Sequence, residues 1–356
     1  MKRHRIALIP GDGIGGEVLG AACRVLDAVG ERTGFELRYD EHPWGCEYYL
    51  RTGEMMPADG LERLSTSDAI LLGAVGYPGV PDHVSLWGLL IPIRRGFQQY
   101  VNLRPIRLFE AVESPLRDLA PDRLDMVIVR ENTEGEYSQI GGRLFEGTER
   151  ELAIQQATFS RHGVQRLLRY GFELATTRRG RVTSATKSNG IPISMPFWDQ
   201  LVDEVASEYR DVEVEHVHVD ALAAGFVLTP HRFDVVVGSN LFGDILSDLG
   251  AAIAGSIGLA PAANLNPERR YPSMFEPVHG SAPDIAGRGI ANPIGAIWSA
   301  AMMLDHLGHT AAAAAVVEAI ARVLAAGRIR TADLGGDAST ESFADAVVSE
   351  FTSAAG

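Results

Sequence analysis

Short apolar runs alternate with amphipathic helical stretches along most of this chain. Residues 5–10 form an apolar run, and residues 15–30 repeat apolar side chains at helical spacing. Further strand-like runs lie at 35–40, 69–75, 124–129, 182–186, 212–219 and 233–238, with helical patterns at 164–177, 195–209 and 242–254. Because strands that alternate with helices form parallel sheets, this order predicts an α/β fold with parallel strands. The segment from Pro293 onward is rich in alanine and is predicted to be largely helical.

The composition is typical of a globular protein that is not membrane-embedded. The 356 residues are 46% hydrophobic and 22% charged, and the length suits two domains. A formal net charge of −14 argues against non-specific binding to nucleic acid or to an anionic membrane surface. Cys23 and Cys46 lack metal-ligand spacing and are expected to be reduced. We recognise neither a signal peptide nor a transmembrane run and therefore expect a cytoplasmic protein with no membrane or nucleic-acid partner.

Two carboxylates four residues apart, Asp244 and Asp248, follow the apolar run 233–238 in the sequence NLFGDILSD (240–248). On a helix, positions i and i+4 share a face, where two acids repel each other unless a cation lies between them. A third acid, Asp220, ends another strand-like run. Three converging carboxylates suit a hard divalent ion such as Mg²⁺ or Mn²⁺, although acids at this spacing also occur on solvated helix faces.

Positive charge gathers where the chain is locally free of acids. Four arginines lie between His83 and Phe109, a stretch without Asp or Glu: Arg94, Arg95, Arg104 and Arg107. This stretch is where we expect an anionic substrate. Arg130 and Lys187 each close a strand-like run, and Tyr137 follows Arg130 by seven residues. Any one of them is equally consistent with a surface charge, but together they indicate a site at the carboxyl ends of strands.

The sequence GDGIGG (11–16) fits the G-x-G-x-x-G pattern of dinucleotide-binding folds, and Asp40 ends the second strand, where such folds place a ribose-binding acid. Asp12 lies inside the turn, however, where a pyrophosphate would meet its negative charge. We therefore interpret the segment as a tight strand-to-helix turn beside a cofactor site. A phosphate-transfer loop is also disfavoured, because no Gly-Lys-Ser/Thr follows.

Seven segments occur in the order found in one enzyme family: IPGDGIG (9–15), NLRP (102–105), VRENTEGEY (129–137), ATKSNG (185–190), NLFGDILSD (240–248), EPVHGSAPD (276–284) and ANP (291–293). The chain thereby resembles, over essentially its whole length, the metal-dependent β-decarboxylating dehydrogenases of the isocitrate/isopropylmalate dehydrogenase family. The segments WGCEYY (44–49) and PDHVSLWG (81–88) look most like the tartrate/D-malate dehydrogenase branch of that family.

The resemblance implies an isocitrate/isopropylmalate dehydrogenase-like fold, with two domains and a cleft between them, rather than a true Rossmann fold. Residues 1–104 and 255–356 would form the large, cofactor-binding domain. Residues 105–254 would form the small domain for dimerisation and metal binding, with an arm near 138–151. It also implies a homodimer with shared active sites, in which each chain lends Lys187 and Asp220 to its partner.

The resemblance further implies a role for each candidate residue. Arg94, Arg104 and Arg130 would bind the substrate carboxylates, while Lys187 and Tyr137 would act as base and acid. Metal ligands would be Asp220, Asp244 and Asp248. The cofactor-binding residues would be His279, Gly280, Ser281, Ala282, Asp284 and Asn292. The implied cofactors are NAD and Mg²⁺ or Mn²⁺, with a monovalent cation such as K⁺ as an optional addition.

The implied reaction is oxidation and β-decarboxylation of a 2-hydroxy dicarboxylate, namely D-malate to pyruvate and CO₂, or tartrate. NAD is favoured over NADP because Asp284 would repel a 2′-phosphate. Trp87 would fill space that an alkyl substituent needs, yet Leu89 and Leu90 would suit such a substituent, so 3-isopropylmalate stays open as an alternative. An inactive regulatory subunit of the same fold is disfavoured, because the metal ligands, the lysine and the tyrosine are all present.

Overall fold

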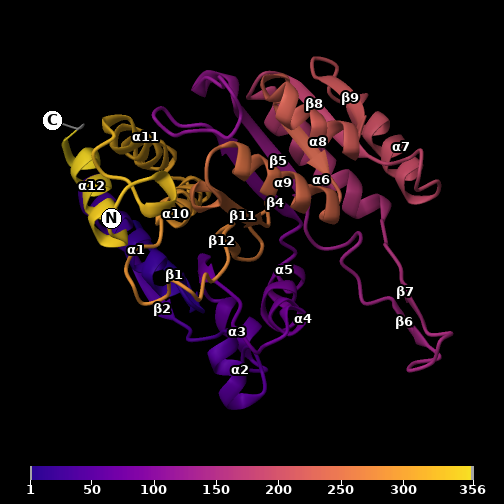
Figure 1. Cartoon of the computed structure of the whole chain (residues 1–356), viewed down its shortest axis with the longest axis horizontal. Helices are drawn as coiled ribbons and strands as arrows, with labels where there is room; N and C mark the ends of the chain where they lie inside the picture. Colours follow the sequence, from indigo (N-terminus) through magenta and orange to yellow (C-terminus); the bar gives the residue numbers. More distant parts are fainter. Residues whose placement is uncertain (1, 354–356) are drawn as a thin grey trace.

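The computed structural model describes residues 2–353. Its main feature is a ten-stranded sheet that runs through the molecule (Figure 1). In spatial order its strands are β2 (Phe35–Glu41), β1 (Lys2–Gly11), β3 (Ala69–Ala74), β12 (Ser273–Pro277), β11 (Pro261–Leu265), β4 (Val101–Arg107), β5 (Asp125–Glu131), β10 (Val235–Gly238), β8 (Arg181–Thr186) and β9 (Glu213–His218). The predicted mixture of strands and helices is therefore present, and the sheet joins parts of the chain that are far apart in sequence.

The centre of the sheet departs from the predicted parallel arrangement. β2, β1, β3 and β12 are parallel, as are β5, β10, β8 and β9. Between these two groups, β11 runs antiparallel to both β12 and β4, and β4 runs antiparallel to β5. A parallel pair needs a long crossover, usually a helix, whereas short connections such as the one from β11 to β12 give antiparallel pairs. The seven strands predicted from the sequence all lie in these two parallel groups. β4, β11 and β12 were not predicted as strands, and the antiparallel centre was missed with them.

Helices surround the sheet. The four helical patterns at 15–30, 164–177, 195–209 and 242–254 and the helical C-terminal segment are confirmed, whereas α2, α3, α4, α5 and α8 were not predicted. The α-helices are α1 (Gly15–Thr33), α2 (Cys46–Thr52), α3 (Gly60–Leu64), α4 (Asp82–Ser85), α5 (Ile91–Gly96), α6 (Arg161–Thr176), α7 (Ser194–Ala206), α8 (Val219–Leu228), α9 (Asn240–Ile253), α10 (Ile294–His306), α11 (Thr310–Ala326) and α12 (Thr340–Ser353). Short helical turns lie at η1 (Leu86–Leu90, a π-helix), η2 (Pro121–Arg123), η3 (Pro230–Arg232), η4 (Ile257–Leu259) and η5 (Ala332–Leu334). Among residues 2–353, no helix is both long and apolar enough to cross a membrane. The cytoplasmic location stays a prediction.

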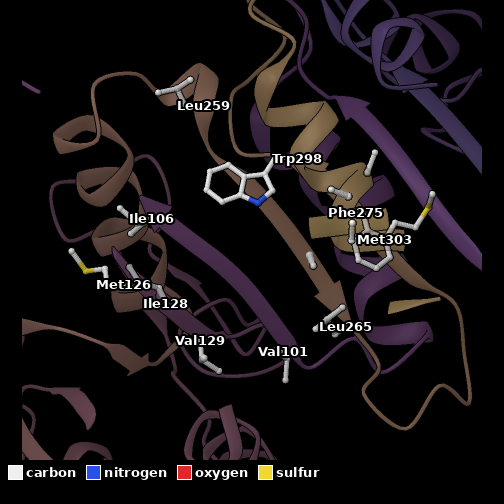
Figure 2. Packing of buried hydrophobic residues seen from close by; sticks show 14 of the residues in the cluster. Val101, Ile106, Met126, Ile128, Val129, Leu259, Leu265, Phe275, Trp298 and Met303 are labelled. Carbon is white, nitrogen blue, oxygen red and sulfur yellow. The ribbon is translucent and has the colours of Figure 1, made fainter. Parts of the chain in front are cut away.

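A large hydrophobic core holds the helices against the sheet. β3 is buried along its whole length, in line with its unbroken apolar sequence AILLGA. α10 packs on β11 and β12, and α9 packs on β4 and β5. Figure 2 shows Trp298 and Phe275 beside the central strands, with Ile106 on β4 and Ile128 on β5. A smaller buried cluster lies among α2, α3, α5 and η1 and includes Leu89.

The predicted arm is a β-hairpin that reaches away from the body of the molecule (Figure 1). β6 (Gly141–Leu144) pairs antiparallel with β7 (Leu152–Gln155). Its exposed apolar side chains are Ile140, Leu144, Phe145, Leu152 and Ile154. Exposed apolar strands are unusual unless something covers them. How the chain divides into domains stays a prediction, and the predicted boundary after residue 104 lies inside β4.

Candidate active site

The alternation of side chains along the central strands creates one strongly polar patch of the sheet. Successive residues of a strand point to opposite faces. Four buried polar residues lie here: Arg104 of β4, Arg130 of β5, Asn264 of β11 and Glu276 of β12. Hydrogen bonds link Arg104 and Arg130 to α9 and Asn264 to Glu276. Polar residues in the middle of a sheet need partners, and α9 and α5 supply them here.

α9 brings both carboxylates of the NLFGDILSD segment to these arginines. The helix begins at Asn240, directly after β10, and Ser239 caps it by accepting from the backbone N–H of Phe242 at 3.4 Å. Gly243 allows the close approach, because a Cβ built there would lie 2.6 Å from Cβ of Arg130. Asp244 and Asp248 then lie one helical turn apart, as their spacing predicted.

Asp244 is the centre of a cluster of charged and polar groups. Tyr137 donates its hydroxyl proton to Oδ2 of Asp244 at 2.6 Å, and Nη1 of Arg130 contacts Oδ1. Nη1 of Arg104 lies 3.4 Å from Asp244 and 3.5 Å from Asp248. The guanidinium of Arg130 also lies over the ring of Tyr137, 5.4 Å from its centroid. The structure therefore brings together five of the predicted site residues from three separate segments of the sequence.

Arg94 joins this cluster from α5. Its Nη2 donates to Glu276 at 2.8 Å, and both side chains are buried. Asn264 donates to the same carboxylate oxygen at 2.7 Å and accepts from Asn102 and Asn132. Nε of Arg94 is buried and has no hydrogen-bond partner within residues 2–353. A buried guanidinium N–H without a partner is costly, and an oxygen of a bound anion would satisfy it.

The cluster carries both signs of charge, so its arginines can bind an anion while its aspartates bind a cation. Burial and the neighbouring Arg104 lower the pKa of Arg130 to about 10, so its guanidinium stays charged at neutral pH. Burial would raise the pKa of Asp244, but Arg130 and Arg104 outweigh it and hold this pKa below its ordinary value. Burial raises the pKa of Asp248, helped by the charge of Asp244 and opposed by Arg104. Burial and the hydrogen bond to Asp244 raise the pKa of Tyr137, which keeps its hydroxyl protonated.

Lys187 and Asp220 form a separate pair. Lys187 follows β8, Asp220 lies in the first turn of α8, and Nζ of Lys187 contacts Oδ1 of Asp220. The side chain of Asp220 is 68% exposed and that of Lys187 is 30% exposed. Neither side chain makes any other hydrogen bond or ion pair within the described part of the chain. The predicted residues thus form two groups within one chain.

The carboxylates of one chain do not by themselves complete a metal site. Within residues 2–353, no three or more His, Cys, Asp or Glu side chains are grouped so that they could hold a metal ion. Asp244 and Asp248 nevertheless fit a hard divalent cation, because both supply oxygen ligands and their mutual repulsion would be relieved by it. Asp220 supplies an exposed oxygen ligand from another surface. The three-aspartate metal site stays a prediction.

The loop predicted to bind the cofactor follows β12. Gly13 lies against it with φ +57°, and a Cβ there would be 2.0 Å from the carbonyl oxygen of Ser281. Nδ1 of His279 donates to the carbonyl of Gly280 at 3.0 Å, which leaves Nε2 buried and without a partner in residues 2–353. Burial lowers the pKa of His279. Its neutral Nε2 therefore fits a ligand N–H donor, such as the exocyclic amine of an adenine.

The other end of the loop offers a carboxylate and an amide. Asp284 is exposed and has no hydrogen-bond partner within the described residues, so it is available to ribose hydroxyls. Nδ2 of Asn292 donates to Asp333 at 2.9 Å. Gly280 and Ala282 lie in the same loop, and Ala282 adopts φ +40°. The cofactor-binding roles stay predictions, but the residues present fit a dinucleotide.

The glycine-rich turn after β1 has the structural role that the sequence favoured. Asp12 is buried and accepts from the backbone N–H groups of Cys46 at 2.8 Å and Gly76 at 2.9 Å. Its carboxylate therefore orders α2 and the loop after β3. A pyrophosphate placed at this turn would meet that carboxylate, which is consistent with the interpretation against a Rossmann site. Asp40 forms an ion pair with Arg5 instead of facing a ligand loop.

Sequence reasoning missed four residues that shape the site. Glu276, the partner of Arg94, lies in the EPVHGSAPD segment but was given no role. Asn132 and Asn264 hydrogen-bond to each other at 2.9 Å across 132 residues of sequence. Asp333 links Asn292 and Ser256. A polar side chain inside a strand could have indicated Glu276 and Asn264, and one directly after a strand could have indicated Asn132, whereas no local pattern marks Asp333.

The segment expected to choose the substrate is partly turned away from the site. Leu89 is fully buried in the smaller core cluster, so it is not available to a substrate. The indole of Trp87 lies 5.0 Å from the guanidinium of Arg95. Arg95 in turn donates to the carbonyls of Thr133 at 3.1 Å and Tyr137 at 2.8 Å. Trp87 is thereby held next to the segment that carries Tyr137.

Comparisons with known proteins agree with this arrangement. A family model described as isocitrate/isopropylmalate dehydrogenase matches residues 5–347. The chain is 57% identical to the D-malate dehydrogenase (decarboxylating) of Escherichia coli (strain K12), with 98% of each chain covered, and 55% identical to the tartrate dehydrogenase/decarboxylase of Pseudomonas putida, with 96% of each covered. The crystal structure of isocitrate dehydrogenase from Methylococcus capsulatus matches with a TM-score of 0.87 at 35% identity, covering 98% of this chain and 99% of that one. The predicted fold class is confirmed, and the chain belongs to the isocitrate/isopropylmalate dehydrogenase family.

Proposed function

We propose that this protein is an NAD- and divalent-metal-dependent dehydrogenase that oxidises and β-decarboxylates a 2-hydroxy dicarboxylate, D-malate or tartrate. The observation that supports this proposal most is the cluster around Asp244, in which Arg94, Arg104 and Arg130 are buried and Tyr137 is half-buried. Relatives with more than half of their residues identical bear the names D-malate dehydrogenase (decarboxylating) and tartrate dehydrogenase/decarboxylase, which supports a decarboxylating dehydrogenase.

The three arginines would hold the two carboxylates of the substrate. A planar guanidinium pairs with carboxylate through two parallel hydrogen bonds and stays charged. Nε of Arg94 is a buried donor that lacks a partner within residues 2–353, and Arg104 and Arg130 lie beside it. Burial strengthens such contacts because water does not screen them. Substrate carboxylates at this position would lie within reach of Asp244 and Asp248.

The chemistry of the reaction needs a hydride acceptor and a positive charge, which NAD and the divalent cation supply when bound. Lys187 would accept the proton of the C2 hydroxyl as the hydride leaves C2. Electrons of the bond to the 3-carboxylate, which departs as CO₂, would pass into an enol. Tyr137 would donate the proton that converts this enol to the keto acid, and its hydroxyl is protonated in the structure's environment. Each such acid or base is typically worth about 10²–10⁴ in rate.

The surroundings of Trp87 favour a small substrate. Its indole is fixed beside Arg95, whose guanidinium binds the carbonyl of Tyr137, so a bulky side chain borders the catalytic segment. Leu89 lies in the core and cannot contact an alkyl group, which removes one of the two residues that kept 3-isopropylmalate as an alternative. D-malate and tartrate carry hydrogen or hydroxyl at the position of that alkyl group.

Two chains are needed to complete each site in this proposal. Lys187 and Asp220 lie together on an exposed surface, apart from the carboxylates that they would join. A homodimer with shared active sites would bring them to the Asp244 cluster of the partner. The exposed apolar hairpin β6–β7 and the exposed side chains of Leu228 and Ile245 on α8 and α9 supply surfaces for such a dimer.

The decisive experiment measures NADH formation with D-malate, tartrate, 3-isopropylmalate and isocitrate, each with Mn²⁺ and with a chelator, and with NAD or NADP. We expect metal-dependent NADH formation, with the highest kcat/KM for D-malate or tartrate. A highest value for 3-isopropylmalate would refute the substrate proposal alone. Absence of turnover with every substrate, in a dimeric and folded protein, would favour an inactive regulatory subunit.

A further inference from the structure

A cavity lies on the opposite side of the sheet from the cluster of Arg94, Arg104 and Arg130, here called the arginine cluster. It has a volume of about 490 Å³ and opens between α6, α10 and α11. Leu103 and Phe275 line it, while their neighbours are Arg104 of the arginine cluster and Glu276, which binds Arg94. Adjacent residues of a strand point to opposite faces. The cavity and the proposed active site are therefore back to back across β4 and β12.

The interior of this cavity is apolar. Its walls include Leu265 from β11, Trp298 and Met302 from α10, and Val317 from α11. Figure 2 shows Trp298 and Leu265 at the two ends of β11, with Phe275 between α10 and the sheet. Small-molecule sites commonly have volumes of about 300–1,000 Å³ with apolar walls and a few polar groups that orient the ligand. Size and lining both fit that description.

The mouth of the cavity carries polar groups that the protein does not use. Five polar side chains line it: Tyr170, Arg269, Asp305, His306 and Thr310. Within residues 2–353, none of the five makes a side-chain hydrogen bond or ion pair. Arg269 and Asp305 are oppositely charged and exposed, and within residues 2–353 they do not pair with each other. Burial and the positive charge of Arg269 lower the pKa of His306 to about 4. The mouth thus presents a cation and an anion that have no side-chain partner in the described part of the chain, beside an apolar interior.

We propose that this cavity binds an α-amino acid with an apolar side chain. The carboxylate would pair with Arg269, the ammonium group would pair with Asp305, and the side chain would enter between Trp298 and Leu265. A zwitterion satisfies both charges at the mouth. A simple carboxylate would face Asp305 and a simple amine would face Arg269, so each would lose part of the attraction.

Three probes with the same apolar body separate these alternatives: L-phenylalanine, 3-phenylpropionate and phenethylamine. Binding would be measured by isothermal titration calorimetry. We expect one saturable site per chain for phenylalanine and binding weaker by roughly fivefold for each singly charged probe. Because the readout is binding, the result does not depend on the proposed reaction.

Variants locate the site, and the chain offers matched controls. Ala314 lines the cavity from the exposed side of α11, so Ala314→Phe would fill it without disturbing the core. Ala311→Phe places the same side chain on another exposed position of α11, outside the lining. Arg269→Gln removes the proposed carboxylate partner, and Arg270→Gln removes the same charge from the adjacent residue.

Ala314→Phe should weaken phenylalanine binding at least tenfold, and Arg269→Gln roughly fivefold, while both control variants bind as the wild type does. Three results would overturn the proposal: no saturable binding of phenylalanine or leucine, binding unaffected by Ala314→Phe, or 3-phenylpropionate or phenethylamine binding as tightly as phenylalanine. Circular dichroism of each variant confirms that a loss of binding is not a loss of fold.

Discussion

The Asp244 cluster and the Lys187–Asp220 pair are two parts of one proposed site, yet the protein holds them in opposite ways. Arg130 is 2% exposed and binds Asp244 and Asn240, whereas the side chain of Asp220 is 68% exposed and, within residues 2–353, hydrogen-bonds or ion-pairs with Lys187 alone. A buried, multiply bonded group is fixed by the interior, while an exposed ion pair contributes little and is readily rearranged. One part of the site is therefore built within the chain, and we propose that the other is presented to a second chain.

The largest expected effect comes from separating the two parts onto different chains. Lys187→Ala and Arg130→Gln should each lower kcat by on the order of 10³-fold, because each removes a group that acts on the substrate. Co-expressed in equal amounts, the two variants should recover about one quarter of the wild-type rate, since half of the dimers would contain one intact site. The measurement is steady-state NADH formation on the purified mixture.

A mixture that stays as inactive as its components would refute the shared site. If each site were built from a single chain, every site in the mixture would carry one of the two substitutions. Arg130 is buried, so its variant requires a check of folding by circular dichroism. Lys187→Ala mixed with Tyr137→Phe gives the same test with a milder change in the buried part. Recovery in the mixture with Tyr137→Phe but not in the mixture with Arg130→Gln would point to misfolding of the Arg130 variant.

Tyr137→Phe tests the buried part alone and should lower kcat by about 10²–10⁴-fold. The phenyl ring keeps the contact with Arg130 but cannot donate a proton. Tyr100→Phe is the matched control, because Tyr100 also donates a hydrogen bond to a carboxylate, that of Glu268, at 2.7 Å. If the two variants lose rate equally, the loss of a hydrogen bond to a carboxylate accounts for the effect, and Tyr137 is not the acid.

The sequence predicted the local parts of this site well. The spacing of Asp244 and Asp248, and the apolar run before them, predicted a helix after a strand, and α9 follows β10 as expected. These features depend on neighbours within a few residues. The absence of acids around Arg94 and Arg104 likewise predicted a positive region, and both arginines lie in the cluster with Arg130.

The central strands could not be predicted, because their stability comes from distant partners. β4 has the sequence VNLRPIR, with two arginines and a proline, and does not resemble a buried strand. It is buried because Asn102 bonds to Asn264 at 2.7 Å and Arg104 bonds to Ser247 at 2.6 Å, contacts that span more than a hundred residues. No local pattern contains that information, and the antiparallel centre and the role of Glu276 were missed for the same reason.

A smaller effect is expected on stability from Glu131, which follows Arg130 at the end of β5. Its side chain is fully buried, and burial raises its pKa to about 7 although three donors of Thr133 and Glu134 bind it. The folded protein therefore binds the proton more tightly than the unfolded chain, whose ordinary value is 4.5. The free energy of unfolding should fall as pH rises from about 4.5 to about 7, by at most about 3 kcal/mol.

Comparison with Glu131→Gln isolates this effect, because glutamine does not titrate and the other groups are unchanged. Denaturant unfolding of both proteins at pH 5 and pH 8 should show the wild type losing stability relative to the variant at the higher pH. A difference that does not change with pH would show that the three donors keep the carboxylate ionised throughout. The test depends on the sign of the change with pH in the stability difference between the two proteins, and not on the absolute stability of either.

The smallest expected effect concerns Asp284, an exposed carboxylate that resembles Asp220 in having few partners of its own. A carboxylate accepts hydrogen bonds from a ribose 2′-hydroxyl and repels a 2′-phosphate, so Asp284→Lys should raise kcat/KM with NADP relative to NAD by roughly tenfold, about 1.4 kcal/mol. Asp122→Lys, at the exposed turn η2, makes the same change of net charge elsewhere and should leave the ratio unchanged. An equal shift in both variants would mean that overall charge, and not a contact in the loop, sets the preference. A shift confined to Asp284→Lys would show that an exposed acid can bind a ligand although buried contacts do not hold it in place. The same is proposed for Asp220.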